Sequence, residues 1–252
     1  MSTSSENKTS TGDGLNVEVE TLDSNTSQEH DKKVISLLVE NNPKINLHTI
    51  NFTAVFARLL ERFLPGTRRA PLKQISDWIN HPQSKQTVFW ITGDAGTGKS
   101  IISAKVLDLH YENSLIGWHF CRHSSPLENS SIAIIESVSG IMASRLPEYE
   151  SAILDIDQKA LEKAKKEEDS LDFYRLLFTQ PLNNMEPPKD RDGKFCRKFI
   201  IIDALDEIDD GHLDTFLRIA RECFPDSPSW FGFFMTSRRY DKILRSLSVK
   251  VS

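Results

Sequence analysis

The sequence predicts an α/β fold in which helices cover both faces of a mainly parallel sheet. Apolar, β-branched runs alternate along the chain with segments whose apolar residues recur at helical spacing. A glycine-rich loop stands between one such run and a helical segment, and acidic residues directly follow another run. Because strand–helix–strand units connect with a right-handed crossover, this alternation favours parallel strands with a helix layer on each side.

The N-terminal part of the chain has little to bury. Ser, Thr, Asn and acidic residues dominate the first 32 of the 252 residues, and we expect residues 1–44 to form a disordered or low-complexity leader. A short apolar island at 34–39 is either a docking helix or a partner-binding segment.

Two amphipathic helices are expected before the glycine-rich loop. Apolar residues recur at i, i+3, i+4, i+7, i+8 and i+11 over 52–63, and a shorter stripe covers 72–79. The simplest reading of both stripes is core packing. The remaining elements are a buried strand at 87–92, a helix at 101–109, a strand at 115–121, helices at 135–146, 150–168 and 171–178, a surface loop at 183–197, and strands at 199–202 and 231–235 with a helix at 213–220 between them.

Residues 93–100 match the pattern G-x-x-x-x-G-K-[ST] of a phosphate-binding loop. Glycines let backbone N–H groups converge on phosphate oxygens, and the following helix adds the positive end of its dipole. Lys99 would bring a positive charge to the β- and γ-phosphates, and the Ser100 hydroxyl is a suitable ligand for Mg²⁺. The motif therefore predicts a three-layer P-loop NTPase fold. The predicted nucleotide-contacting residues are Gly93, Asp94, Ala95, Gly96, Thr97, Gly98, Lys99 and Ser100.

Acidic residues follow the apolar strand at 199–202. A P-loop fold that hydrolyses nucleotide needs one carboxylate at a strand tip to order Mg²⁺ and another to polarise the attacking water. We assign the metal role to Asp203, together with Ser100, and the water role to Glu207, with Asp206 as the next candidate. Arg238, at the end of the strand expected beside the loop, is a candidate for contacting the γ-phosphate.

Composition restricts the partners. The net charge of −5 gives no overall attraction to nucleic acid or anionic lipid. No segment approaches the length of a membrane span, and the N-terminus lacks the apolar region of a secretion signal. The three widely spaced cysteines do not form a disulfide framework, which indicates a reducing compartment. We expect a cytoplasmic protein whose partners include neither nucleic acid nor a membrane.

Four segments in combination resemble a known family. GDAGTGKS at 93–100, HFCR at 119–122, IIIDALDE at 200–207 and MTSR at 235–238 look like the NACHT-type nucleotide-binding domains of the STAND class of P-loop ATPases, and most like the nephrocystin-type N-terminal P-loop domain. The resemblance spans about residues 62–245. It also covers Gly66, Thr67 and Arg68, which resemble the family's segment that borders the adenine.

The resemblance implies ATP or ADP binding with Mg²⁺, slow hydrolysis, and a switch that drives self-association or engages protein partners. Residues 45–252 would then be a NACHT-like domain truncated at its C-terminal end, because family members continue into a helical lid, a winged helix and often repeats. On this reading, residues 249–251 are the start of a fifth strand.

Two other functions stay open from the sequence. One is a non-catalytic scaffold that binds nucleotide without turnover. The other is a P-loop small-molecule kinase, although Lys163, Lys165 and Lys166 lie among glutamates and are poor candidates for a cationic lid. A GTPase is disfavoured because no Asn-Lys-x-Asp guanine reader follows a late strand.

Overall fold

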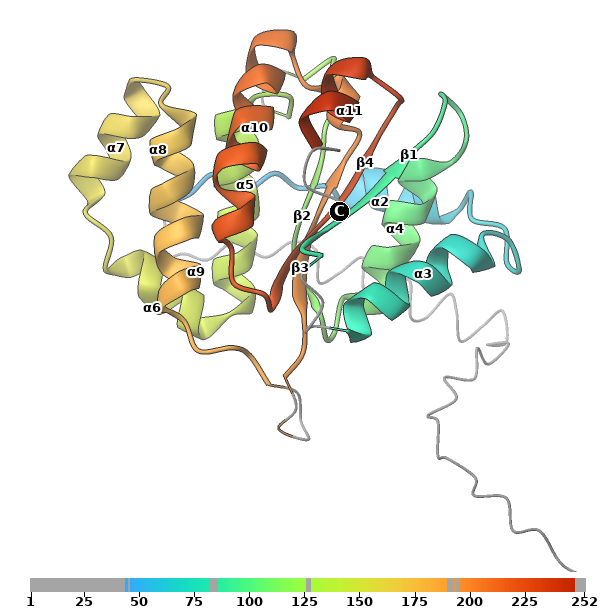
Figure 1. Ribbon diagram of the computed structural model, residues 1–252, viewed down its shortest axis with the longest axis horizontal. Helices are drawn as coiled ribbons and strands as arrows, with labels where there is room; N and C mark the ends of the chain where they lie inside the picture. Colours follow the sequence, from blue (N-terminus) through green and yellow to red (C-terminus); the bar gives the residue numbers. More distant parts are fainter. Residues whose placement is uncertain are drawn as a thin grey trace, which may run out of the picture.

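Four parallel strands form one sheet in the computed structural model, which describes residues 44, 46–81, 86–125, 128–189, 193 and 195–247 (Figure 1). The strands are β1 (Val88–Thr92), β2 (Leu115–Phe120), β3 (Lys198–Asp203) and β4 (Phe231–Ser237), in the spatial order β1-β4-β3-β2. Apart from Lys44, the leader expected over 1–44 lies outside the described residues, as do the apolar island at 34–39 and the strand start at 249–251.

The strand order determines where the loops meet. β4 pairs with β1 on one side and with β3 on the other, and all pairings are parallel. The carboxyl ends of all four strands therefore lie at one edge of the sheet, and the loops that follow them gather there. This edge is at the top of Figure 1.

One face of the sheet packs against the helices that surround the glycine-rich loop. They are α2 (Thr53–Leu60), α3 (Arg69–Asn80) and α4 (Lys99–His110), on the right of Figure 1. The side chains of Phe199, Ile201 and Phe234 point into this core. Their neighbours Ile200, Ile202 and Phe233 belong to the core on the other face, as the two-residue period of a strand requires.

The other face carries the larger layer, on the left of Figure 1. Its helices are α5 (Ser131–Arg145), α6 (Pro147–Leu154), α7 (Gln158–Lys166), α8 (Ser170–Tyr174), α9 (Gln180–Asn184), α10 (Asp210–Glu222) and α11 (Asp241–Leu247). Each face thus has its own apolar core, and the predicted three-layer α/β fold is confirmed. No helix among the described residues is long and apolar enough to cross a membrane.

Three elements differ from expectation. β1 is only half-buried, because β4 is its one strand neighbour in the described sheet. The helix expected over 150–168 is divided into α6 and α7, with the α7 N-cap at Asp157. The helix expected over 171–178 widens into a π-helical turn at Arg175–Thr179, just before Pro181. Proline lacks an N–H and its ring clashes with the carbonyl four residues earlier, which a wider turn relieves.

Candidate functional site

The loop between β1 and α4 has the backbone shape that a phosphate cradle needs. Gly96 and Gly98 have φ values of 76° and 85°, in the left-handed region that residues with a Cβ rarely adopt. The Thr97 hydroxyl donates to the Asp94 carbonyl at 2.9 Å, which closes the turn. The Gly93 N–H donates to the carbonyl of Ser237 at 3.3 Å, which ties the loop to the end of β4. The expected order of strand, loop and helix is therefore present.

Lys99, the first residue of α4, curls back over this loop. Its Nζ donates to the carbonyl oxygens of Gly93 at 2.8 Å and of Asp94 at 2.9 Å. The ammonium group thus lies beside the loop backbone, at the N-terminus of a twelve-residue helix. Two sources of positive potential, the ammonium group and the helix dipole, meet at one place, which suits an anion.

Asp203 ends β3 and is 2% exposed. Its Oδ1 accepts hydrogen bonds from the Ser103 hydroxyl and from the Thr236 hydroxyl, both at 2.6 Å. Burial raises the pKa of Asp203 above its ordinary value of 3.8, while hydrogen bonds from Ser100, Ser103 and Thr236 and the charge of Lys99 lower it. The structure therefore brings together Ser100 and Asp203, the two residues predicted to hold Mg²⁺.

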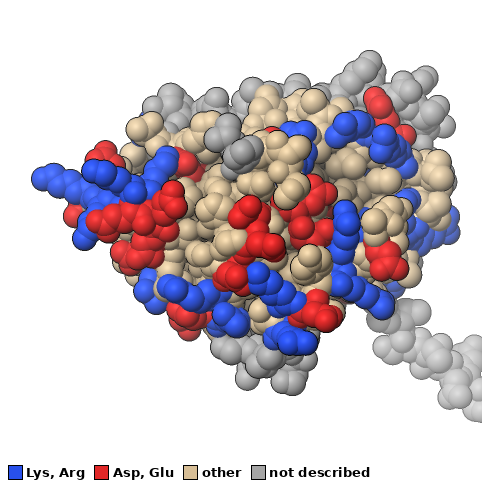
Figure 2. Space-filling view, turned by 90° about the horizontal axis from the view of Figure 1, so that it is seen from above, with Lys and Arg blue, Asp and Glu red and all other residues tan. Residues whose placement is uncertain are grey.

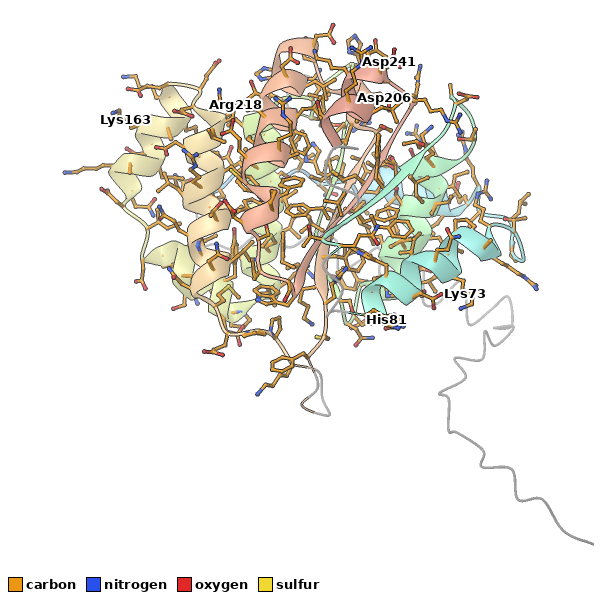
Figure 3. The ribbon with its side chains drawn as sticks, in the orientation of Figure 1. Lys73, His81, Lys163, Asp206, Arg218 and Asp241 are labelled. Atoms are coloured by element: carbon orange, nitrogen blue, oxygen red, sulfur yellow. The ribbon has the colours of Figure 1, made fainter. Side chains whose placement is uncertain are left out.

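The other two acidic residues lie in a short 3₁₀ turn, Leu205–Glu207, that begins after Ala204. Asp206 accepts the backbone N–H of Arg238 at 2.8 Å on Oδ1, and its Oδ2 lies 2.9 Å from Nε of the same arginine. Glu207 accepts the backbone N–H of His123 at 3.2 Å, from the loop that follows β2. The three predicted catalytic side chains thus share one edge of the sheet with the phosphate loop. Figure 3 shows Asp206 at this end, near Asp241 at the start of α11.

The segment before α3 also reaches this site. Arg68 has a left-handed backbone, with φ of 56°, and its Nη1 donates to the Thr67 hydroxyl at 3.0 Å. Its Nη2 would lie 2.6 Å from a Cβ added to Gly98, so the guanidinium group packs directly on the phosphate loop. The preceding Gly66, with φ of 79°, makes the turn that directs the chain there. Gly66, Thr67 and Arg68 are therefore contiguous with the cradle, with the arginine in contact with it.

Sequence reasoning missed the residues that hold the acids in place. Ser103 and Thr236 both donate to Asp203, and the backbone of His123 holds Glu207. A signal existed for Ser103, which follows Lys99 by one helical turn and is a polar residue in a largely apolar helix. Thr236 gave a weaker signal as a polar residue at the end of an apolar strand. A backbone contact such as that of His123 leaves no sequence signal.

Acidic and basic side chains lie together on the face of the molecule that carries the candidate site. Figure 2 looks down on the edge of the sheet that carries the loops, and acidic side chains gather near the middle of this face with Lys and Arg beside them. Among the described residues, no three His, Cys, Asp or Glu side chains are placed to hold a metal ion by themselves. Mg²⁺ suits such a site, because it commonly uses one or two protein ligands and takes the rest from phosphate and water.

The model of one protein family, nephrocystin 3, N-terminal, matches residues 70–238, which is more than half of the chain. The chain belongs to the nephrocystin 3 N-terminal family. The match begins just after Arg68 and ends at Arg238, so this nephrocystin-type domain contains the phosphate loop, the acidic residues and the final arginine. The predicted nephrocystin-type P-loop domain is thereby confirmed.

Other comparisons are more distant. No curated protein matches this nephrocystin-type chain. Among solved structures, Cdc6p from Pyrobaculum aerophilum is similar at 17% sequence identity and a TM-score of 0.46, over 76% of this chain and 45% of that one. The chain thus spans less than half the length of that structure.

Proposed function

We propose that this chain binds ATP and ADP together with Mg²⁺ and hydrolyses ATP slowly. The observation that carries the proposal is that Ser100, in the first turn of the helix after the phosphate loop, lies next to the buried carboxylate of Asp203. A serine hydroxyl and a carboxylate that lie next to a phosphate cradle are the two protein ligands that Mg²⁺ needs when phosphate oxygens complete its shell.

Each group in the site has a chemical part in this reaction. The loop N–H groups and Lys99 hold the β- and γ-phosphates, and Mg²⁺, when bound, neutralises charge on the same oxygens. Glu207 accepts a proton from a water molecule whose oxygen forms a bond to the γ-phosphorus. The bond from that phosphorus to the β,γ-bridging oxygen breaks, which gives ADP and phosphate. Arg238 stabilises the negative charge that develops on the γ-phosphate oxygens.

Nucleotide binding is tested by Lys99→Ala. We expect at least a tenfold loss of ATP affinity, measured by titration with a fluorescent ATP analogue in the presence of Mg²⁺. The matched control is Lys73→Ala, because Lys73 is a 76% exposed lysine on α3 that pairs with the exposed Asp77. Figure 3 shows Lys73 on α3, far from Asp206. Undiminished ATP affinity in Lys99→Ala would contradict the proposal.

We further propose that the domain acts as a NACHT-type switch of the STAND class in the cytoplasm, where its nucleotide state controls self-association or protein partners. Membership of the nephrocystin 3 N-terminal family and the resemblance of the four motifs support this proposal. Size-exclusion chromatography with light scattering, in ADP and in a non-hydrolysable ATP analogue, tests it. The same elution mass in both nucleotides, with no difference in partner binding, would count against a switch.

A scaffold that binds nucleotide without turnover is separated from an ATPase by Glu207→Gln. If the wild type releases phosphate and this variant does not while still binding ATP, the chain is an enzyme. The kinase alternative is weakened by the position of the lysine cluster considered as its lid. Lys165 pairs with the buried Glu136 of α5, and Figure 3 shows Lys163 at the left end of the molecule, well separated from Asp206.

A further inference from the structure

The two neighbouring acids, Asp206 and Glu207, have different surroundings. Both oxygens of Asp206 face Arg238, one through the backbone N–H at 2.8 Å and the other through Nε at 2.9 Å. The Asp206 side chain is 6% exposed, whereas that of Arg238 is 54% exposed. The carboxylate is therefore buried against the base of an arginine whose outer part faces solvent.

Glu207 is held by a single bond. Its Oε2 accepts the backbone N–H of His123 at 3.2 Å, and its other oxygen has no hydrogen-bond partner among the described residues. A carboxylate with one free oxygen can accept a proton from water without breaking an ion pair. Asp206 has no such oxygen, because protonation of either one would weaken its contact with a cation or with an amide.

We propose that Asp206 is a positioning residue for Arg238 and that Glu207 alone polarises the attacking water. The inference rests on the proposed function and assigns separate tasks to the two acids. Asp206 contributes to binding of the γ-phosphate by holding Arg238 in position. Glu207 contributes to hydrolysis of the γ-phosphate by polarising the attacking water.

The geometry explains how Asp206 would position the arginine. Its bond to the backbone N–H of Arg238 fixes the chain at the point where β4 ends. Its contact with Nε fixes the base of the guanidinium group and leaves the two Nη groups, which are the donors best placed to bind a phosphate in a forked manner. Without this contact, an exposed arginine would sample many rotamers. The entropy that it would lose on binding the γ-phosphate would then lower the affinity for ATP.

The test compares ATP and ADP affinities with single-turnover hydrolysis, because a merely structural residue would not change the ATP-to-ADP preference. The variants are Asp206→Ala, Asp206→Asn, Arg238→Ala, the Asp206→Ala/Arg238→Ala double variant and Glu207→Gln. The control is Asp210→Ala, which removes an exposed acid nearby on α10. Thermal melting of each variant checks that it is folded.

We expect Asp206→Ala to lower ATP affinity about tenfold with little change for ADP, as expected for loss of one charge-assisted contact. Arg238→Ala should do the same, and the double variant should add nothing further, because the two residues act as one unit. Asp206→Asn keeps an acceptor for the backbone N–H and should fall between wild type and Asp206→Ala. Glu207→Gln should keep the ATP preference and lose hydrolysis.

Three results would overturn the inference while leaving nucleotide binding intact. The first is a wild type that binds ATP and ADP equally, and the second is an Asp206→Ala variant that keeps the full preference for ATP. The third is loss of hydrolysis in Asp206→Asn at saturating ATP with normal hydrolysis in Glu207→Gln. Failure of the Lys99→Ala test, in contrast, would remove the proposed function itself.

Discussion

Thr236 offers a sharp test of how the site is held together. Its hydroxyl is fully buried, donates to Asp203 at 2.6 Å and accepts the backbone N–H of Ala204 at 2.9 Å. Valine has the same shape but neither donates nor accepts, so Thr236→Val removes both hydrogen bonds without leaving a cavity. This substitution therefore separates hydrogen bonding from packing.

The size of the effect follows from the two partners. Loss of a hydrogen bond to a charged group costs about 1.5–3 kcal/mol, and an unpaired buried N–H costs about 1–3 kcal/mol. Because the two losses share one hydroxyl and are not additive, we expect Thr236→Val to lower the free energy of unfolding by about 3 kcal/mol. Thr236→Ser keeps the hydroxyl and loses one methyl group, which costs about 1 kcal/mol.

Urea unfolding at pH 7, followed by circular dichroism, measures these values. The control is Thr215→Val on α10, where the hydroxyl donates to the carbonyl of Gly211 at an exposed position, and we expect a change within about 0.5 kcal/mol. If packing governed this position, serine would be the more damaging substitution at Thr236. A Thr236→Val variant as stable as the wild type would refute the reasoning.

Three further predictions concern the same edge of the sheet. Ala204→Gly should raise the free energy of unfolding by about 0.5–1 kcal/mol in urea unfolding, because Ala204 has a left-handed φ of 60°; a loss of stability would contradict this. Burial raises the pKa of Asp203, so the folded state binds the extra proton and the stability of the wild type falls as pH rises from 3.8 through the raised pKa. Asp203→Asn should flatten this part of a pH–stability profile, and an unchanged profile would show that Asp203 is not its source. Gly96→Ala and Gly98→Ala should each cost about 1–2 kcal/mol from the left-handed backbone, with only a small excess for Gly98, because the group that its Cβ would meet is the flexible end of Arg68. That excess should disappear in an Arg68→Ala background.

The sequence was sufficient for the strands, for their parallel pairing and for the edge of the sheet where the site lies. Continuous apolar runs such as residues 199–202 are typical of central strands, and the parallel pairing follows from the helices between the strands. The position of Asp203 at the end of β3 then places it at the same edge as the phosphate loop. These inferences need only local patterns and the chirality of the connections.

Helix ends and irregular turns could not be obtained in the same way. α5 begins at Ser131, four residues before the helix expected over 135–146, because Ser130 caps it by accepting the N–H of Ala133. The π-helical turn before Pro181 depends on how the chain packs between α8 and α9, and apolar spacing does not encode it. The half-buried state of β1 depends on which strands lie beside it.

Contacts between distant segments were the other gap. The hydrogen bond from the Arg238 N–H to Asp206 joins the loop after β3 to the end of β4. The contact of Arg68 with Gly98 joins the segment before α3 to the loop after β1. Each residue had been selected from its own motif, but the partner within each pair follows only from the strand order. This is why the sequence left Asp206 and Glu207 as alternatives for one role, whereas their contacts distinguish them.

The features of this edge that lower stability support a functional interpretation. Only three non-glycine residues in the described part of the chain have a positive φ, and two of them, Arg68 and Ala204, border the candidate site. Asp203, next to Ala204, is a buried carboxylate whose charged form is disfavoured by burial. Glycine at position 204 and asparagine at position 203 would relieve both costs without changing the fold. A strained backbone and a buried acid at the same edge of a sheet are expected where ligand binding offsets their cost in stability. A sequence selected for stability alone would keep neither.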